Sequence, residues 1–97
     1  MTKAEAKFQQ DLRTMGCIVC RLFLGVRSPA NIHHILSGSR RKGEMFALPL
    51  CRYHHQGGCN NPTYVSRHPF KKAFEARYGS ELVLLEKCKE LIAKGIL

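Results

Sequence analysis

Apolar side chains recur at helical spacing over the first fifteen residues of the chain. The intervals are four, four and three residues, which places on one face of an α-helix the side chains of Ala4, Phe8, Leu12 and Met15. Gly16 comes directly after the last of them, and glycine commonly ends a helix. The pattern therefore predicts a helix from Thr2 to Met15 that packs as a lid over the rest of the molecule.

Two apolar runs of strand length occupy the middle of the chain. The first covers residues 31–36 and contains a histidine pair, and the second covers residues 45–50. Residues 37–43 between them are rich in serine, glycine and basic side chains, which is typical of a flexible loop. We expect the two runs to form a β-hairpin, preceded by a loop over residues 21–30, where a glycine and a Ser-Pro pair interrupt any regular pattern.

A short helix and a loop are predicted after the hairpin. Residues 51–56 place Cys51 and two histidines in the first turns of a helix, and Gly57-Gly58 would end it. Residues 59–66 contain two asparagines and a proline, which favour a loop. Chemically active side chains are thus expected at the start of a helix that follows the second strand.

Two more helices are predicted toward the C-terminus. His68-Pro69 would start the first, because proline favours the first helical position, and its aromatic face comprises Phe70, Phe74 and Tyr78. Ser80 is a typical cap for the last helix, whose apolar stripe comprises Leu84, Cys88, Leu91 and Ile92. The elements together predict an α+β fold in one domain, residues 1–97, with a helix over 1–16, a core over 17–58 and helices over 68–94.

The net charge of the chain favours a polyanionic partner. Sixteen Lys and Arg residues against seven acidic residues give a formal charge of +9 and a pI near 9.7, a balance common in nucleic-acid-binding domains. The basic side chains cluster at Arg40-Arg41-Lys42 and at Arg67, Lys71 and Lys72. A generically basic protein, in which charge only maintains solubility, is the alternative. No helical segment combines a basic face with a bulky apolar one, so we expect no membrane partner.

The five cysteines are expected to be reduced and free to bind metal. Residues 1–11 are charged and lack the apolar core of a signal peptide, and no apolar run approaches the roughly 20 residues of a membrane span. We therefore expect a cytoplasmic protein, in a compartment where disulfides are rare. A chain this short buries only about two-thirds of its unfolded surface, so a structural metal would add needed stability.

A Cys-x-x-Cys pair and a Cys-x-x-His pair have the spacing of a tetrahedral zinc site. Cys17 with Cys20, and Cys51 with His54, would supply four sulfur and nitrogen ligands, a closed set typical of structural zinc. Buried reduced cysteines without an ion are the alternative. Cys59 is an alternative to His54 as the fourth ligand.

The adjacent histidines 33 and 34 indicate a second, catalytic site. Neighbouring side chains on a strand point to opposite faces, so one imidazole can bind a metal ion while the other stays free for proton transfer. His55 would project about 100° from His54, toward the hairpin. Two or three imidazoles from this pair, His55 and His68 would then hold a divalent ion that polarises a phosphate. Plain hydrogen-bonded histidines are the alternative, and for His68 a helix cap is an equally good one.

These motifs together resemble the HNH endonucleases, which have a small zinc-stapled ββα-metal (His-Me finger) domain with flanking helices in members of this kind. The likeness lies in Cys-x-x-Cys at 17–20, His33-His34-Ile35 at a strand end, and Leu-Pro-Leu-Cys-x-x-His-His at 48–55. Within the superfamily the chain is most similar to the phage RecA-dependent, recombination-enhancement nucleases. That likeness extends through residues 54–58 and 68–79, so it covers most of the chain from Cys17 to about Leu85.

The resemblance implies a role for each histidine. His33 would bind the catalytic ion, which is magnesium or another divalent cation, and His34 would be the general base. His55 would be a second ligand of that ion, and His68 a third. The Cys3His set corresponds to the structural zinc ligands of zinc-containing members.

Two positions depart from the family pattern. Phe46 stands near the asparagine of the family name, and Leu36 stands where some relatives place a carboxylate. Neither side chain can orient an imidazole or bind a metal ion. An asparagine at position 31, 60 or 61 could take that place.

The favoured hypothesis is a metal-dependent DNA endonuclease with weak sequence specificity. Contacts to the DNA backbone carry little sequence information, and we expect them from Arg40, Arg41, Lys42, Lys71, Lys72 and Arg77. The resemblance implies a location in a bacterial or phage-infected host cell, and it adds a RecA-type recombinase filament that would direct cleavage. A non-catalytic zinc-stabilised module that binds DNA or protein is the alternative, but it gives no reason for a histidine pair that faces His55.

Overall fold

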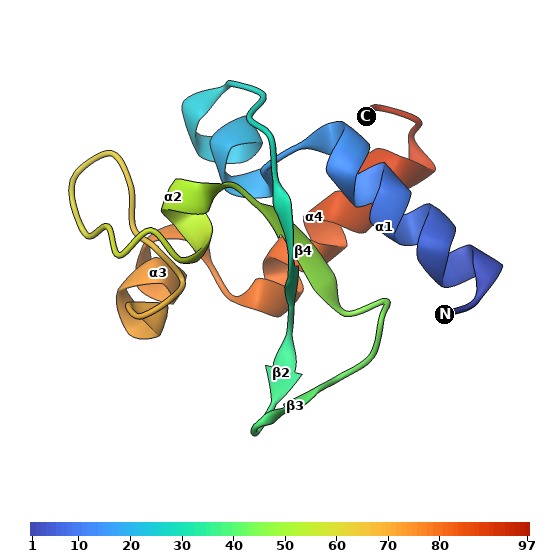
Figure 1. The fold of residues 1–97 in the computed structure, drawn as a ribbon. Coiled ribbons are helices and arrows are strands. Elements are labelled where there is room, and N and C mark those ends of the chain that lie inside the picture. The colour runs from blue at the N-terminus through green and yellow to red at the C-terminus, as the bar shows by residue number, and fades with distance from the viewer.

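The computed structural model describes residues 1–97 as an α+β protein with four α-helices and two small antiparallel sheets (Figure 1). The first sheet pairs β1 (Asn31–His34) with β4 (Ala47–Leu50), and the second pairs β2 (Leu36–Ser37) with β3 (Arg40–Arg41). Helix α2 (Arg52–His55) directly follows β4. Two antiparallel strands and a helix thus form the centre of the molecule, and the predicted α+β class is confirmed.

Helix α1 (Lys3–Met15) begins at a capping box and ends at a glycine. Thr2 Oγ1 accepts a hydrogen bond from the Glu5 N–H at 3.1 Å, and the Glu5 carboxylate accepts one from the Thr2 N–H at 2.7 Å. Gly16 has a φ of 76°, and a Cβ there would lie 2.6 Å from the Ser28 carbonyl oxygen. Only glycine allows this close passage, which leads the chain into Cys17.

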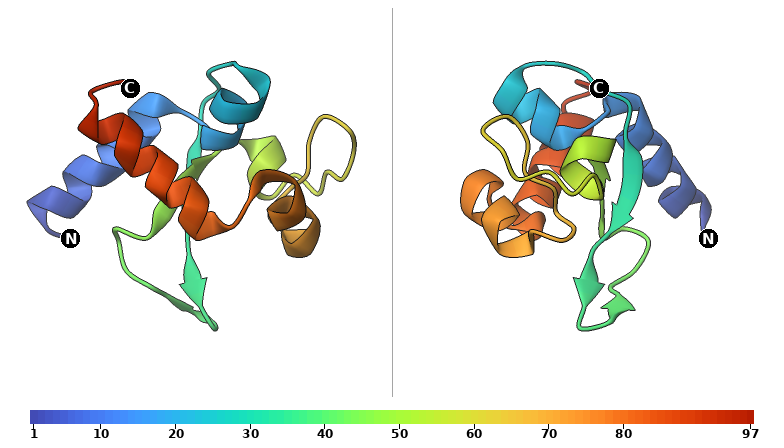
Figure 2. Two further views of the ribbon diagram at one scale, coloured as in Figure 1. Left: turned by 180° about the vertical axis from the view of Figure 1, so that it is seen from behind. Right: turned by 60° about the vertical axis from the view of Figure 1, so that its left-hand side comes forward.

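The β1–β4 sheet is covered on both faces. Helix α1 packs on β1 and β4 through Phe8, Leu12 and Met15, whereas Ala4 is exposed. Helix α4 (Glu81–Ala93) also packs on β4, which is buried along its whole length. In the right-hand view of Figure 2 the strands lie between α1 on one side and α2 with α3 (Lys71–Tyr78) on the other. Helix α1 therefore covers one face of the sheet and also contributes side chains to the core.

The basic segment 37–43 is not the flexible loop that the sequence predicted. Ser37 pairs with Arg40, and Leu36, just before the segment, pairs with Arg41. The resulting short hairpin projects from the body of the protein (Figure 1). Ile35 links the two sheets, because its N–H donates to the Phe46 carbonyl at 2.9 Å and its own carbonyl accepts from the Lys42 N–H at 3.0 Å. The pairing of β1 with β4 thus continues past a break into β2 and β3.

Two further boundaries differ from the prediction. Residues 21–24 do not belong to a loop, because Cys20–Leu24 forms a π-helical turn that ends at Gly25. Helix α3 begins at Lys71, three residues after His68. The N–H groups of Arg67 and His68 donate instead to the carbonyls of His54 and His55, each at 2.8 Å. These bonds hold the segment against α2 and delay the start of the helix.

The last helix agrees closely with the prediction. The Ser80 hydroxyl caps α4 by accepting from the Val83 N–H at 3.2 Å. Leu84 and Cys88 are buried in the core, and Leu91 and Ile92 pack against it. Each helix of the protein is too short or too polar to span a lipid bilayer.

Candidate functional site

Three cysteines and one histidine meet at a buried point. The sulfur atoms of Cys17, Cys20 and Cys51 and the Nδ1 of His54 all lie within 4.8 Å of one another. Nδ1 is 3.5 Å from the sulfurs of Cys17 and Cys20 and 3.2 Å from that of Cys51. A tetrahedral zinc ion with Zn–S bonds of about 2.3 Å places nitrogen and sulfur ligands roughly 3.6 Å apart. The side chains therefore have the spacing that zinc requires.

The chemistry of this Cys3His cluster also fits zinc. Burial raises the pKa of the Cys17 and Cys20 thiols and lowers the pKa of His54 to about 4. A bound cation would offset that burial, since thiolate and neutral imidazole are the forms that bind zinc. The second ring nitrogen of His54, Nε2, is buried without a hydrogen-bond partner. The histidine is thus held in place by the cluster and by ring packing on Tyr64 and Tyr78.

The other two cysteines lie outside the cluster. The Cys59 thiol is half-buried and its hydrogen-bond partner is the Gly57 carbonyl, at 3.8 Å, so Cys59 does not replace His54. Cys88 is fully buried in α4, and burial raises its pKa to about 12. The metal-binding group is therefore the one that the two spacing motifs predicted.

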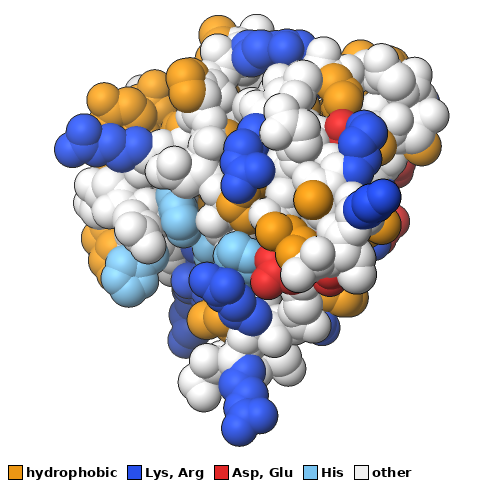
Figure 3. All heavy atoms as spheres, turned by 45° about the vertical axis from the view of Figure 1, so that its right-hand side comes forward, with side chains coloured by type: hydrophobic (Ala, Val, Ile, Leu, Met, Phe, Trp, Pro, Cys, Tyr) orange, Lys and Arg blue, Asp and Glu red, His pale blue; other side chains and the backbone are white.

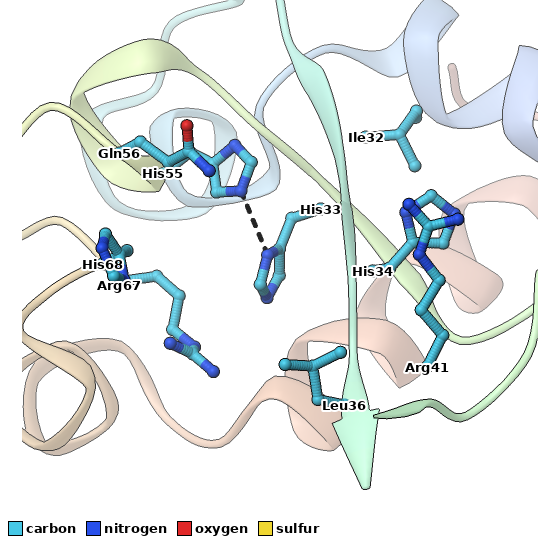
Figure 4. A pocket seen from close by; sticks show the side chains of 9 residues that line it. All are labelled: Ile32, His33, His34, Leu36, Arg41, His55, Gln56, Arg67 and His68. Atoms are coloured by element: carbon cyan, nitrogen blue, oxygen red, sulfur yellow. Dashed lines mark hydrogen bonds between the residues drawn. The ribbon is translucent and has the colours of Figure 1, made fainter. Parts of the chain in front are cut away.

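Helix α2 directs two adjacent histidines to two sites. Cys51 is its N-cap, and the Cys51 carbonyl accepts hydrogen bonds from the N–H groups of His54 at 3.1 Å and His55 at 2.9 Å. Successive side chains on a helix point about 100° apart. His54 therefore points into the Cys3His cluster, while His55 points toward β1 (Figure 4).

A hollow of about 370 Å³ lies beside β1, whose second edge is unpaired. It is lined by Ile32, His33, His34, Leu36, Arg41, His55, Gln56, Arg67 and His68. Within it, Nδ1 of His33 is 3.2 Å from Nε2 of His55, the contact marked by the dashed line in Figure 4. Adjacent ligands of an octahedral ion with bonds of about 2.1 Å lie roughly 3.0 Å apart. The two nitrogens are thus spaced as two neighbouring ligands would be.

The ionisation of His55 suits a metal ligand. Burial, followed by the charges of His33, Arg67 and His68, lowers its pKa to about 4. The imidazole is consequently neutral at physiological pH, and only the neutral ring has a lone pair to offer. His68 lines the same hollow and brings a further imidazole to it.

The two histidines of the pair leave opposite faces of β1, as strand geometry requires. Figure 4 shows His33 pointing toward His55, and His34 pointing to the other side of the strand beside Arg41. Both residues line the hollow at the strand edge.

Each member of the pair contacts a carboxylate that the sequence interpretation missed. Nε2 of His33 lies 2.6 Å from Glu81 Oε2, and Nε2 of His34 lies 3.2 Å from Glu44 Oε2. Glu44 precedes β4, and its Oε2 also accepts a hydrogen bond from Gln9 of α1 at 2.7 Å. The hydrogen bond with His34, followed by the one from Gln9, lowers the pKa of Glu44. This carboxylate is therefore ionised beside His34.

Glu81 is held in the first turn of α4. Its Oε1 accepts a hydrogen bond from Arg67 Nε at 3.0 Å. Burial opposes ionisation of this carboxyl, but the hydrogen bond and charge of His33 and the charge of Arg67 outweigh it and lower its pKa. In the sequence this residue is distinguished only by its place directly after Ser80, the expected cap of the last helix.

Of the six predicted DNA-contacting residues, one lines this hollow. Arg41 lines it, and Lys42 and Lys71 line a second hollow of about 180 Å³ that shares Leu36 with the first. Figure 3 shows the histidines gathered on one face, with Lys and Arg side chains beside them and at the projecting tip. Arg40 and Lys72 are exposed, and Arg77 donates hydrogen bonds to the carbonyls of Asn61 and Pro62.

The protein is thus a small α+β domain with a buried Cys3His cluster that could hold a metal ion. It also has a hollow lined by histidine and arginine side chains. Over residues 1–93 the chain matches the model of the family described as "Recombination enhancement, RecA-dependent nuclease", and it belongs to that family. The resemblance drawn from the motifs is thereby confirmed for the family. Among curated proteins, none matches this chain.

Proposed function

We propose that this protein is a metal-dependent endonuclease that hydrolyses phosphodiester bonds in DNA. Membership of a nuclease family supports the reaction class. The observation that supports metal-dependent phosphodiester hydrolysis is the 3.2 Å approach of His33 Nδ1 to His55 Nε2, in a hollow that is also lined by His34 and Arg41. This arrangement combines the ligands of a divalent ion, a basic group for proton transfer and a cation for phosphate.

His33 and His55 would hold the ion, with His68 as a third candidate ligand. A bound divalent cation such as magnesium stabilises negative charge on a phosphate undergoing attack and on the leaving oxygen. Arg41 supplies a second positive charge in the same hollow. The protein's contribution is thus to fix two imidazoles and one guanidinium around the scissile phosphate.

His34 would act as the general base. If its Nε2 donates to the ionised Glu44, the lone pair on Nδ1 is left to take a proton from water. The carboxylate also favours the imidazolium that forms after the transfer. Glu44 thereby performs the orienting function that Phe46 and Leu36 cannot.

DNA would cross the two adjoining hollows. Arg41 lies in the first, and Lys42 and Lys71 lie in the second. Arg40, Lys72 and Arg77 would extend this basic surface. Contacts of this type neutralise phosphates without reading bases, so we expect weak sequence preference. The words "RecA-dependent" in the family's description support direction by a RecA-type filament.

Nicking of supercoiled plasmid tests the proposal. We expect nicks that require added magnesium or manganese and that His34→Ala abolishes, while Glu86→Gln, an exposed change on α4, retains them. Zinc content and melting temperature of each variant establish that it is folded. DNA binding without metal-dependent nicking would instead indicate a non-catalytic zinc-stabilised module.

A further inference from the structure

Glu81 joins three parts of the protein that are distant in sequence. Its two oxygens contact His33 of β1 at 2.6 Å and Arg67 of the segment before α3 at 3.0 Å. Glu81 and His33 are only 7% and 8% exposed. The His33 ring then continues to His55 of α2 at 3.2 Å. An unbroken chain of contacts therefore runs from Arg67 through Glu81 and His33 to His55.

We propose that Glu81 is the positioning residue of the metal site, which fixes the tautomer of His33 so that its Nδ1 lone pair faces the ion. The inference rests on the proposed role of His33 and His55 as ligands. An ionised carboxylate can only accept hydrogen bonds, so the ring hydrogen of a neutral His33 must lie on Nε2. Nδ1 is then left with a lone pair, and this is the atom that faces His55.

Arg67 completes the arrangement by holding the carboxylate. Its Nε donates to Oε1 of Glu81, which leaves Oε2 for His33. The Arg67 N–H also donates to the His54 carbonyl at 2.8 Å, so the same residue is tied to the helix of the Cys3His cluster. Carboxylates that hydrogen-bond a ligating histidine fix its orientation and strengthen its binding to metal. Glu81 is thus expected to raise affinity for the ion without touching it.

The same geometry assigns different behaviour to the two ligands. Without an ion, Nδ1 of a neutral His33 has no hydrogen, so the 3.2 Å contact requires that His55 donate from Nε2. When an ion binds, both of these nitrogens need lone pairs. His55 must therefore move its hydrogen to Nδ1, whereas His33 keeps its hydrogen on Nε2.

Nitrogen-15 NMR of the histidine rings tests the proposal on the intact zinc-containing protein. In the wild type we expect His33 as the Nε2–H tautomer both without and with magnesium, and His55 changing from Nε2–H to Nδ1–H as magnesium is added. Glu81→Gln should leave His33 as a mixture of tautomers. By isothermal titration, its affinity for magnesium should fall by about 10- to 100-fold, the usual effect of losing such a partner.

Glu86→Gln is the matched control, because it removes one carboxylate from the same helix at an exposed position paired with Lys89. It should change neither the His33 tautomer nor magnesium affinity. A wild-type His33 that bears its hydrogen on Nδ1 would overturn the proposal, even if Glu81→Gln did not fold. Unchanged magnesium affinity in folded Glu81→Gln would overturn it as well. Neither readout depends on DNA cleavage, so a protein that binds magnesium as expected but never nicks DNA would contradict the nuclease proposal alone.

Discussion

Glu44 Oε2 lies 3.2 Å from His34 Nε2, and this contact places a carboxylate on the histidine that faces away from His55. The resemblance to the HNH endonucleases implies an orienting asparagine near position 46, where Phe46 instead packs beneath the ammonium group of Lys42. The structure brings the polar group from two residues earlier, in the segment that enters β4. His34 therefore has a charged partner, although Phe46 stands near the position of the family's asparagine.

We predict that the Cys3His cluster binds one zinc ion that stabilises the fold by several kcal/mol, as structural zinc does in small domains. Cys51→Ser removes one ligand and leaves three groups buried around an incomplete site, so both zinc content and melting temperature should fall sharply. Elemental analysis and thermal melts measure the two effects, and a strong chelator should unfold the wild-type protein.

Cys59→Ser is the control for that experiment, since its thiol lies outside the cluster. It should retain zinc and melt with the wild type. Zinc-free folded wild-type protein, or a Cys51→Ser variant that melts normally, would refute a structural zinc site.

We predict that the projecting β2–β3 hairpin supplies much of the electrostatic affinity for DNA. Replacing Arg40, Arg41 and Lys42 together by alanine should lower the slope of log affinity against log salt by about 0.9 for each DNA phosphate that the variant no longer neutralises. The comparison variant replaces three exposed cations elsewhere, Lys3, Arg13 and Lys94, and has the same net charge. Equal slopes for the two variants would place the DNA on another surface, most simply that of Lys71 and Lys72.

We predict that His55 makes the fold less stable as the pH falls from about 6.5 to about 4. The pKa of His55 is about 4 in the folded protein and 6.5 for a free imidazole, so in this interval the unfolded chain binds a proton that the folded protein excludes. Proton uptake by the unfolded state favours unfolding, and stability is therefore lost with decreasing pH. In thermal melts, the advantage of the wild type over His55→Gln should shrink across this range.

The Cys3His cluster titrates in both of these proteins, so its contribution cancels in the difference. Parallel stability curves for the wild type and His55→Gln between pH 7 and pH 4 would contradict the depressed pKa of His55 given by burial and neighbouring charge.

We predict that Glu44→Gln slows DNA cleavage while zinc content and magnesium affinity stay unchanged. The amide keeps the size of the side chain but removes the charge that favours the protonated ring of His34, so it should cost part of the roughly 10²- to 10⁴-fold that a positioned base contributes. Gln9→Ala should act in the same direction and more weakly, because the Gln9 amide holds Glu44 at 2.7 Å. A full cleavage rate in Glu44→Gln would remove Glu44 from the site.

Local signals in the sequence were sufficient to predict a feature wherever residues of a single helix or turn determine its geometry. The two-residue gaps in Cys17–Cys20 and Cys51–His54 predict the metal-binding group, since each gap brings two ligands to one side of a turn. The same is true of the cap at Ser80 and of the end of α1 at Gly16. These features depend on neighbours within a few residues.

Contacts between distant segments were missed for the opposite reason. Glu81 lies 48 residues from His33, and nothing in its local sequence distinguishes it from an ordinary acidic residue in a first helical turn. The start of α3 was misplaced because the N–H groups of Arg67 and His68 bond to α2, a tertiary contact that overrides the preference of proline for a helix start. Tertiary packing thus determines which carboxylate contacts His33, whereas local spacing was enough to predict the Cys3His group.

The adjacent histidines provide the most specific prediction, because they leave opposite faces of β1 toward different partners. His33 faces His55, so His33→Ala should weaken magnesium binding, and excess metal should partly restore cleavage. His34 faces Glu44, so His34→Ala should leave magnesium and DNA affinity intact while lowering the cleavage rate by about 10²- to 10⁴-fold.

Neither change should remove zinc or unfold the protein, since the Cys3His cluster uses other residues. Single-turnover cleavage and calorimetric titration of magnesium separate the two effects, because the first reports the chemical step and the second reports occupancy of the ion site. If His34→Ala lost magnesium while His33→Ala lost only rate, the two roles would have to be exchanged, and the contact between His33 and Glu81 would then orient the base. If both variants cleaved DNA at the wild-type rate, the pair would have no part in catalysis. The 3.2 Å approach of His33 to His55 would then be a packing contact alone.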